Sequence, residues 1–240
     1  MKFMAQMARK RLPRRLIQLY IGLLLYGVSI ALQVRSGLGL DPWDVFHQGI
    51  SRHVGLAIGT VVIIVGAVVL LGWIPLRQRP GVGTVSNVVL IGVSMNASLR
   101  WLPHVHLMGW RITDLLAGVL LCGVATGMYI GANLGPGPRD GLMTGLARRT
   151  GRSIRFTRTA LEVTVLVTGW LLGGTVGVGT VIFALAIGPL AQVFMPVFDV
   201  AVPEIAESAT LIKIVGRTGQ PGREPVDRHL EVGVGVDEAL

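Results

Sequence analysis

The sequence predicts an all-α integral membrane protein with about six transmembrane helices, arranged as two inverted repeats of three spans. Of its 240 residues, 51% are hydrophobic and only 15% are charged, whereas an average soluble domain has about 25% charged residues. The apolar residues gather into runs of roughly 20, the length that crosses a bilayer core. A Pro-Asp motif also occurs twice, as GLGLDPWD at 37–44 and as NLGPGPRD at 133–140.

The apolar runs divide the chain into a basic N-terminus, two membrane units and a polar tail. The runs are 16–34, 58–76, 83–99, 112–132, 159–172 and 177–198. The first run is longer than the core of a secretion signal and matches a later span, so we expect it to be retained as the first helix. The expected parts are a basic cytoplasmic N-terminus 1–15, membrane repeat units 16–110 and 111–198, and a flexible cytoplasmic tail 199–240.

A shift of 96 residues reveals the repeat. Residues 20–96 then fall on 116–192 without a gap, and 23 of the 77 positions are identical. The identities include Gly, Pro and Asp residues in one register, which biased composition does not produce, so we interpret them as a tandem duplication. Because each unit has three spans, an odd number, the second unit must enter the membrane from the opposite side. Many secondary transporters are built on this inverted plan.

Two motifs of the repeat are expected to shape the backbone. Gly-Val-Gly-Thr ends at Thr84 in the first unit and at Thr180 in the second. Its glycines permit a tight turn between helices, and its threonine suits a helix cap. A phosphate-binding loop would need a lysine and a preceding strand, and both are missing. The structural positions are Gly81, Gly83, Gly177 and Gly179 in this motif, and Gly39, Pro42, Gly135 and Pro138 in the Pro-Asp segment.

The distribution of charge predicts the orientation and argues against nucleic-acid binding. The net charge is +9, and residues 1–198 hold 18 basic and 5 acidic residues. The basic residues cluster at helix ends, most of them on the side of the N-terminus, so the positive-inside rule predicts cytoplasmic N- and C-termini. Loop 36–56 is then external and loop 135–153 cytoplasmic. Eight spans, with both short helices crossing, would give nearly the same asymmetry.

The Pro-Asp segment predicts a short amphipathic helix in each unit. Asp41 suits an N-cap, Pro42 the first helical position and Asp44 the third, where a carboxylate complements the helix dipole. Gly137, Pro138 and Asp140 take the same places in the second unit. The first of these helices carries one apolar stripe, formed by Trp43, Phe46, Ile50 and Val54. Such a helix is too short and polar to span, so we expect it at the interface or as a re-entrant element.

Two interpretations of the charged residues stay open. Asp44 and Asp140 either cap their helices or line a central cavity, where they would suit a cation. Glu162 is either functional, as an ionisable residue inside a span, or paired with Arg158 on the same helix face. We expect Asp44 to be the more sensitive aspartate, because Arg139 and Arg148 partly neutralise Asp140. The candidate substrate or ion path comprises Asp41, Asp44, Asn87, Asp140, Arg158 and Glu162.

The order of spans and the segment GLGLDPWDVFHQGIS, with the later IGT, resemble the YczE/YyaS/YitT family of bacterial multi-span membrane proteins. The resemblance covers residues 12–198 and implies a multi-pass protein of the bacterial cell membrane. It also implies a link with secondary-metabolite production, known for some relatives. The second unit departs from the pattern, with Gly137 in place of Asp41 and Arg139 in place of Trp43.

These features favour a small secondary transporter or permease whose inverted halves rock around a site near Asp44, Asp140 and Glu162. The alternative is a non-transporting membrane factor that regulates or assembles with other proteins through the tail. An enzyme is not expected, because no nucleophile–base pair, zinc motif or carboxylate dyad stands at recognisable spacing. We expect no cofactor and no metal site. The expected partners are membrane lipid and a small solute, not nucleic acid; homo-oligomerisation is left open.

Overall fold

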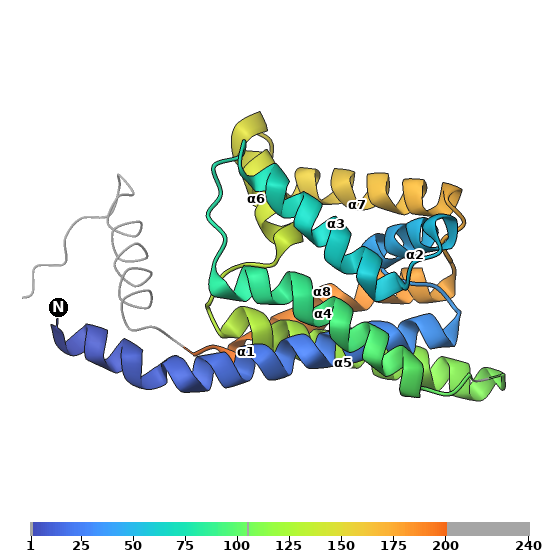
Figure 1. Cartoon of the computed structure of the whole chain (residues 1–240), viewed down its shortest axis with the longest axis horizontal. Helices are drawn as coiled ribbons and strands as arrows, with labels where there is room; N and C mark the ends of the chain where they lie inside the picture. Colours follow the sequence, from blue (N-terminus) through green and yellow to red (C-terminus); the bar gives the residue numbers. More distant parts are fainter. Residues whose placement is uncertain (1, 105, 201–240) are drawn as a thin grey trace, which may run out of the picture. The chain divides into compact units, whose positions relative to one another are not determined.

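The structure, a computed structural model, describes residues 2–104 and 106–200, with side chains from residue 12 onward, so most of the expected tail lies outside the described residues. The described chain folds into α-helices joined by short loops (Figure 1). The helices are α1 (Lys2–Ser36), α2 (Pro42–Val54), α3 (Ile58–Trp73), α4 (Val82–Trp101), α5 (Met108–Gly131), α6 (Pro138–Thr150), α7 (Ile154–Leu171) and α8 (Val178–Phe198). Helix α1 runs from Lys2 through the rest of the basic segment and on into the first apolar run.

The helix boundaries follow the repeat. Helices α2, α3 and α4 begin at Pro42, Ile58 and Val82, and α6, α7 and α8 begin 96 residues later in each case. The short helices α2 and α6 end in the same way, at glycines with left-handed φ of 71° and 68°. A residue with a Cβ is disfavoured in this conformation, so the glycine stops the helix. The last three helices of each unit thus begin at equivalent residues.

The eight helices of the described residues form two layers, and each layer contains two helices from each unit (Figure 1). In the first layer, α1 packs against α4 and α5, and α5 packs against α8. In the second layer, α2 packs against α3 and α7, and α6 packs against the same two helices. Contacts between α3 and α4 join the layers. The first layer therefore holds the four longest helices, and the second layer holds the four shorter ones.

Among the described residues, four helices are long and apolar enough to cross a membrane: α1 from Leu12, α4, α5 and α8. Helices α2 and α3 qualify together as a fifth, broken span or re-entrant element, bent by 112°. The six-span arrangement is not confirmed. Helix α3 has 16 residues and is about 24 Å long at 1.5 Å per residue, short of a roughly 30 Å bilayer core. Helix α7 carries Arg155, Arg158 and Glu162, and these charges lower its hydropathy.

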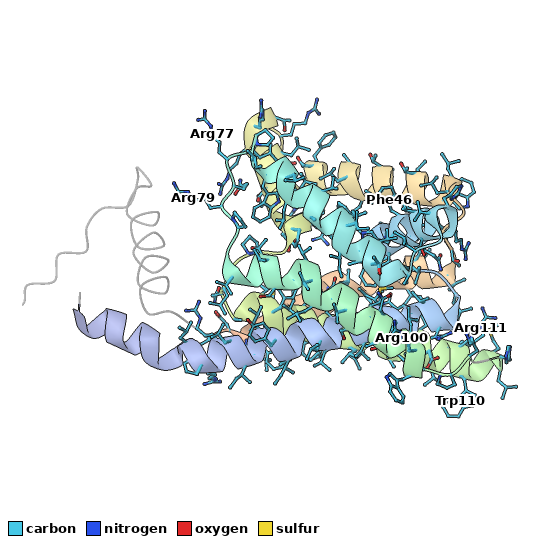
Figure 2. All side chains as sticks on the ribbon, in the orientation of Figure 1. Phe46, Arg77, Arg79, Arg100, Trp110 and Arg111 are labelled. Carbon is cyan, nitrogen blue, oxygen red and sulfur yellow. The ribbon has the colours of Figure 1, made fainter. Side chains whose placement is uncertain are left out.

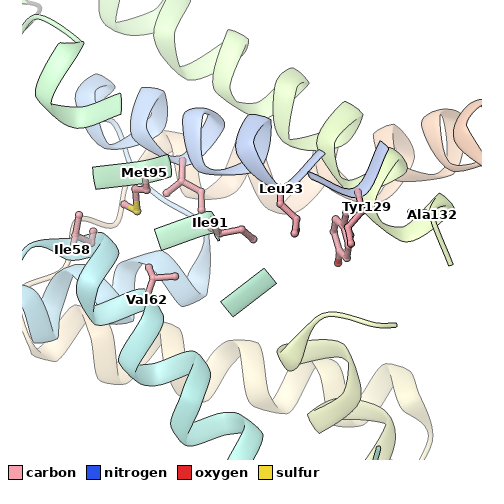
Figure 3. Packing of buried hydrophobic residues seen from close by; sticks show 9 residues of the cluster. Leu23, Ile58, Val62, Ile91, Met95, Tyr129 and Ala132 are labelled. Atoms are coloured by element: carbon pink, nitrogen blue, oxygen red, sulfur yellow. The ribbon is translucent and has the colours of Figure 1, made fainter. Parts of the chain in front are cut away.

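The main apolar core lies where α1, α3, α4 and α5 meet (Figure 3). Its residues are Leu19, Leu23, Ile30, Ile58, Val62, Ile91, Met95, Tyr129 and Ala132. A second cluster joins α5 to α8 through Leu115, Val119, Cys122 and Phe183. Large apolar side chains such as Leu71, Leu116 and Leu185 remain exposed on the outer faces. Such a surface suits contact with lipid rather than with water.

Reciprocal contacts connect the two units. The Gly179 N–H donates to the Leu38 carbonyl at 2.8 Å, and the equivalent Gly83 N–H donates to the Leu134 carbonyl at 2.9 Å. Gly39 and Gly135, which follow these carbonyls, both have φ of 125°. A Cβ at either position would lie 2.8 Å from the threonine hydroxyl of the opposite unit's Gly-Val-Gly-Thr motif. The Pro-Asp segment of each unit is therefore seated on the Gly-Val-Gly-Thr motif of the other.

The threonines act at the third helical position rather than as N-caps. Gly81 and Gly177 are the N-caps of α4 and α8, and their N–H groups donate to the Thr84 and Thr180 hydroxyls at 3.1 and 3.3 Å. Thr84 also donates to the Pro136 carbonyl at 2.7 Å. These contacts satisfy backbone groups at a helix start.

Candidate functional site

A cavity of about 360 Å³ lies between the two helix layers. Both layers contribute to its wall, from Tyr26 on α1 and Asn87 on α4 to Met143 on α6 and Glu162 on α7. Its volume is in the range of small-molecule sites, which run from about 300 to 1,000 Å³. Five of the six candidate path residues line it: Asp41, Asn87, Asp140, Arg158 and Glu162.

Equivalent positions of the two units face the cavity together. The pairs that line it are 41 and 137, 42 and 138, 43 and 139, 47 and 143, 62 and 158, 66 and 162, 87 and 183, and 91 and 187. The chemistry differs within most pairs, because Arg158 and Glu162 stand where the first unit has Val62 and Gly66. The cavity is thus shared by the two units in position but is asymmetric in charge.

The start of α2 confirms Asp41 as the N-cap. Its side chain accepts a hydrogen bond from the Asp44 backbone N–H at 2.7 Å, and Pro42 begins the helix. The equivalent α6 begins after Gly137, which has no side chain to act as a cap. Asp41 therefore satisfies one of the free N–H groups at the start of α2 with one carboxylate oxygen. Its second oxygen is left for another partner.

That partner is Arg139 of the second unit. Its guanidinium lies 3.3 Å from Asp41 Oδ2 and 3.7 Å from Asp44 Oδ1. The same guanidinium lies over the Trp43 ring, 5.2 Å from the ring centroid, within the range of a cation–π contact. The expectation that Arg139 neutralises Asp140 is wrong, because the arginine pairs with the carboxylates of the other unit. The starts of α2 and α6 are thereby joined across the repeat.

Asp44 lies beneath the cavity surface rather than on its wall. It is buried, with 2% of its surface exposed, and its Oδ1 lies 3.0 Å from His47 Nδ1. The expected apolar stripe of α2 is only partly buried, since Val54 is 55% exposed while Asp44 and His47 are covered. Arg139 lies beside this buried carboxylate and can stabilise its charge. Asp44 therefore has charged or polar partners beyond its own helix start.

Asp140 has different surroundings. Its Oδ2 accepts a hydrogen bond from the Tyr129 hydroxyl at 3.0 Å. The Tyr129 ring meets the Tyr26 ring edge-on, with centroids 6.0 Å apart. Within the described residues, no basic nitrogen lies within 4.0 Å of the Asp140 carboxylate. Asp140 thus presents a carboxylate to the cavity beside two aromatic rings.

Arg158 and Glu162 form the expected pair on α7, with Nε of the arginine 2.9 Å from Oε1 of the glutamate. Their side chains are 56% and 33% exposed, and both line the cavity. The two interpretations of Glu162 are therefore compatible, because the pair is satisfied and still open to a ligand. Asn87 lines the same cavity.

Asn96, the second asparagine of α4, joins two helices. Its side-chain oxygen accepts from the Gly59 N–H at 2.9 Å, and its amide lies 3.2 Å from the Thr60 hydroxyl. Hydrogen bonds of this kind hold helices together in membranes.

Sequence reasoning missed two residues that shape the site, Tyr26 and Tyr129, and the contact of Arg139 with Asp41 and Asp44. The two tyrosines have no equivalents, because Cys122 and Gln33 stand at their repeat positions. Nothing in the repeat therefore marks them. The sequence did carry a signal for Arg139, because this residue stands where the repeat would place a tryptophan equivalent to Trp43. In the structure, Arg139 lies over the Trp43 ring.

Comparison with known proteins gives the family. The model of the family described as "Family of unknown function (DUF6198)" matches residues 13–196. The chain is 40% identical over 177 residues to an uncharacterized protein of Haemophilus influenzae, covering 74% of this chain and 81% of the relative. It is 36% identical over 176 residues to the uncharacterized membrane protein YczE of Bacillus subtilis, covering 72% and 81%.

A third relative, the uncharacterized protein YyaS of Bacillus subtilis, is 26% identical over 183 residues, which covers 75% of this chain and 91% of the relative. No solved structure matches the chain. The family match covers both repeat units, the Pro-Asp segments and all the cavity-lining residues. It confirms the resemblance found in the sequence: the chain belongs to the YczE/YyaS-like membrane protein family DUF6198.

Proposed function

We propose that the protein is a small secondary transporter, or permease, that carries a small solute through the cavity between its helix layers. The observation that carries this proposal is the cavity itself, about 360 Å³ in volume and lined at equivalent positions by both units. Substrate sites of inverted-repeat transporters lie at such a junction between repeats. The proposal assigns no catalysed reaction to the chain.

The proposed topology has two inverted units and cytoplasmic termini in the bacterial cell membrane. Helices α2 and α6 lie at opposite ends of the second layer (Figure 1). Arg77 and Arg79 lie at the α6 end, and Arg100 and Arg111 at the other (Figure 2). The last turn of α6 also carries Arg148 and Arg149, so the excess of basic residues supports a cytoplasmic position for that end. In this arrangement α3 and α7 complete six spans together with the four longest helices.

The proposed motion is a rocking of one layer against the other. The reciprocal contacts of Leu38 with Gly179 and of Leu134 with Gly83 join the layers through short loops. Each of the two contacts belongs to a different Pro-Asp segment, and the α2 and α6 helices that follow lie toward opposite ends (Figure 1). A tilt about them would open the cavity at one end while closing it at the other. This is the alternating access of inverted-repeat transporters.

A plug in the cavity tests the proposal. Gly188 lines the cavity, and a Cβ placed there meets nothing within 4 Å. Gly109 on α5 has equally open surroundings but does not line the cavity. Phe at position 188 should fill part of the cavity and block passage, whereas Gly109→Phe should not.

The measurement is the concentration of solutes inside and outside cells. A strain that lacks the gene is compared with strains in which the gene, wild type or variant, has been restored at matched protein abundance. We expect at least one solute whose distribution is restored by the wild type and by Gly109→Phe, but not by Gly188→Phe. If no solute depends on the protein, or if both variants restore it equally, the transport proposal fails. The non-transporting membrane factor would then be the better account.

A further inference from the structure

We infer that the cavity binds a small monovalent organic cation, with Asp140 as the counter-ion and the Tyr26 and Tyr129 rings beside its apolar groups. This inference rests on the proposed function and gives the chemical class of its solute. It follows from three properties of the cavity wall: the surplus of negative charge, the position of the aromatic rings and the small number of oxygen ligands.

The charges of the cavity do not balance. Arg158 is paired with Glu162, which leaves this part of the wall neutral. Arg139 is the one arginine beside both Asp41 and Asp44 in the described chain. Asp140 has the Tyr129 hydroxyl as its hydrogen-bond donor and no basic partner among the described residues. The wall thus carries more carboxylates than cations, which favours a cationic ligand and opposes an anionic one.

Aromatic rings lie next to the free carboxylate. Tyr26, Trp43, Tyr129 and Phe183 all line the cavity. The Trp43 ring already holds the guanidinium of Arg139, which shows the preference of such a face for a cation. The hydroxyl of Tyr129 contacts Asp140, so its ring is within reach of any cation bound to that carboxylate. A positive group with an apolar shell gains from both the charge and the ring faces.

A bare metal ion fits this wall poorly. Hard cations take about six or more oxygen ligands in the case of calcium, or keep several waters in the case of magnesium. No group of three His, Cys, Asp or Glu residues in the described part of the chain is placed to hold a metal. Much of the remaining wall is apolar, with Val62, Val65 and Ile91 among its residues. An organic cation brings its own apolar surface and needs fewer ligands.

Binding to the purified protein in detergent tests the inference, with tetramethylammonium chloride as the probe. Sodium chloride at equal concentration and tert-butyl alcohol, a neutral molecule of similar shape, serve as comparisons. We expect tetramethylammonium to bind, as measured by calorimetry, and Asp140→Asn to weaken this binding at least tenfold. Asp114→Asn, which changes a carboxylate on α5 that does not line the cavity, should leave binding unchanged.

Two further variants protect the test against a folding defect. Gly188→Phe leaves Asp140 intact but fills the cavity, and it should abolish binding. Tyr129→Phe keeps the ring and removes the hydroxyl, so it should change the affinity by less than about threefold. Equal binding of tert-butyl alcohol, a response to sodium alone, or full binding by both Asp140→Asn and Gly188→Phe would overturn the inference.

The failure of this inference is distinguishable from failure of the proposed function. If the cavity plug blocks the movement of a neutral or anionic solute and tetramethylammonium does not bind, the transporter stands and the cation class is wrong. If tetramethylammonium binds through Asp140 but no solute depends on the protein in cells, the site stands and the transport proposal is wrong.

Discussion

Gly179 donates its backbone N–H to the carbonyl oxygen of Leu38 at 2.8 Å, and this contact has a counterpart at the equivalent positions of the other unit. The Pro-Asp segment of one unit therefore rests on the Gly-Val-Gly-Thr motif of the other. Both motifs return together in the sequence because each is the other's partner in space. A change in one motif alone would leave its counterpart without a matching surface.

Replacing the first glycine of either Gly-Val-Gly-Thr copy, as Gly81→Ala or Gly177→Ala, should destabilise the protein. A Cβ at Gly81 would lie 2.4 Å from the Leu134 carbonyl oxygen, and a Cβ at Gly177 would lie 2.4 Å from the Leu38 carbonyl oxygen. We expect each substitution to cost about 1–3 kcal/mol, as for overpacking of a tight contact. Thermal unfolding in detergent measures the effect, with Gly109→Ala as the neutral control. A neutral result at either motif would contradict the reciprocal contact.

Large and small residues exchange places where the short helices pack. Trp73 of α3 lies over Gly141 of α6, whose added Cβ would be 2.0 Å from the indole ring. At the equivalent contact, Gly169 of α7 lies against α2 at Val45 and Phe46. In the repeat, Trp73 of α3 corresponds to Gly169 of α7, and Gly141 of α6 corresponds to Val45 of α2. The large side chain and the glycine have thus exchanged helices between the two pairs, although Trp with Gly fills more space than Gly with Val.

The double variant Trp73→Gly with Gly141→Val should therefore be more stable than the sum of its single changes predicts. Gly141→Val alone clashes with the indole, and Trp73→Gly alone leaves a void and loses the hydrogen bond to the Pro138 carbonyl. Together they copy the pair found between α7 and α2. We expect a favourable coupling of about 1 kcal/mol or more from a double-mutant cycle on unfolding midpoints. Simple additivity would show that the two residues do not share one packing site.

The sequence was sufficient for the elements that depend on local or repeated signals. Asp41 and Pro42 mark the start of α2 because capping is a local effect, and the repeat carries that start to Pro138. It was insufficient for contacts between distant segments. Arg139 pairs with Asp41 rather than with the adjacent Asp140 because the starts of α2 and α6 lie close together. No local sequence pattern indicates that these two helix starts are neighbours.

Removal of the Arg139 charge should destabilise the contact between the two units. Arg139→Gln leaves Asp41 and Asp44 close together without their cation. We expect a loss of about 2 kcal/mol, below the full effect of a fully buried pair because the arginine side chain is 25% exposed. The exposed Arg148 of the same helix provides the control Arg148→Gln. Adding Asp41→Asn to Arg139→Gln should restore part of the stability, and no restoration would contradict the pairing.

The pair on α7 should matter more for function than for stability. Because Arg158 and Glu162 are partly exposed, their contact should contribute less than about 1 kcal/mol. We expect Glu162→Gln to reach the membrane at normal abundance and to lose most of the transport identified with the cavity plug. Arg158→Gln with Glu162→Gln should unfold at the same temperature as the wild type. Normal transport by Glu162→Gln would remove this residue from the path.

The inverted arrangement of the two units is the central claim, and cysteine labelling tests it most directly. Val54 and Thr150 occupy equivalent exposed positions at the ends of α2 and α6. Each is replaced by cysteine in a Cys122→Ala background, which removes the only native thiol. A membrane-impermeant maleimide is then added to intact cells and to inside-out vesicles. The account predicts labelling of Val54→Cys from outside and of Thr150→Cys from the cytoplasmic face; labelling of both from the same face would contradict it.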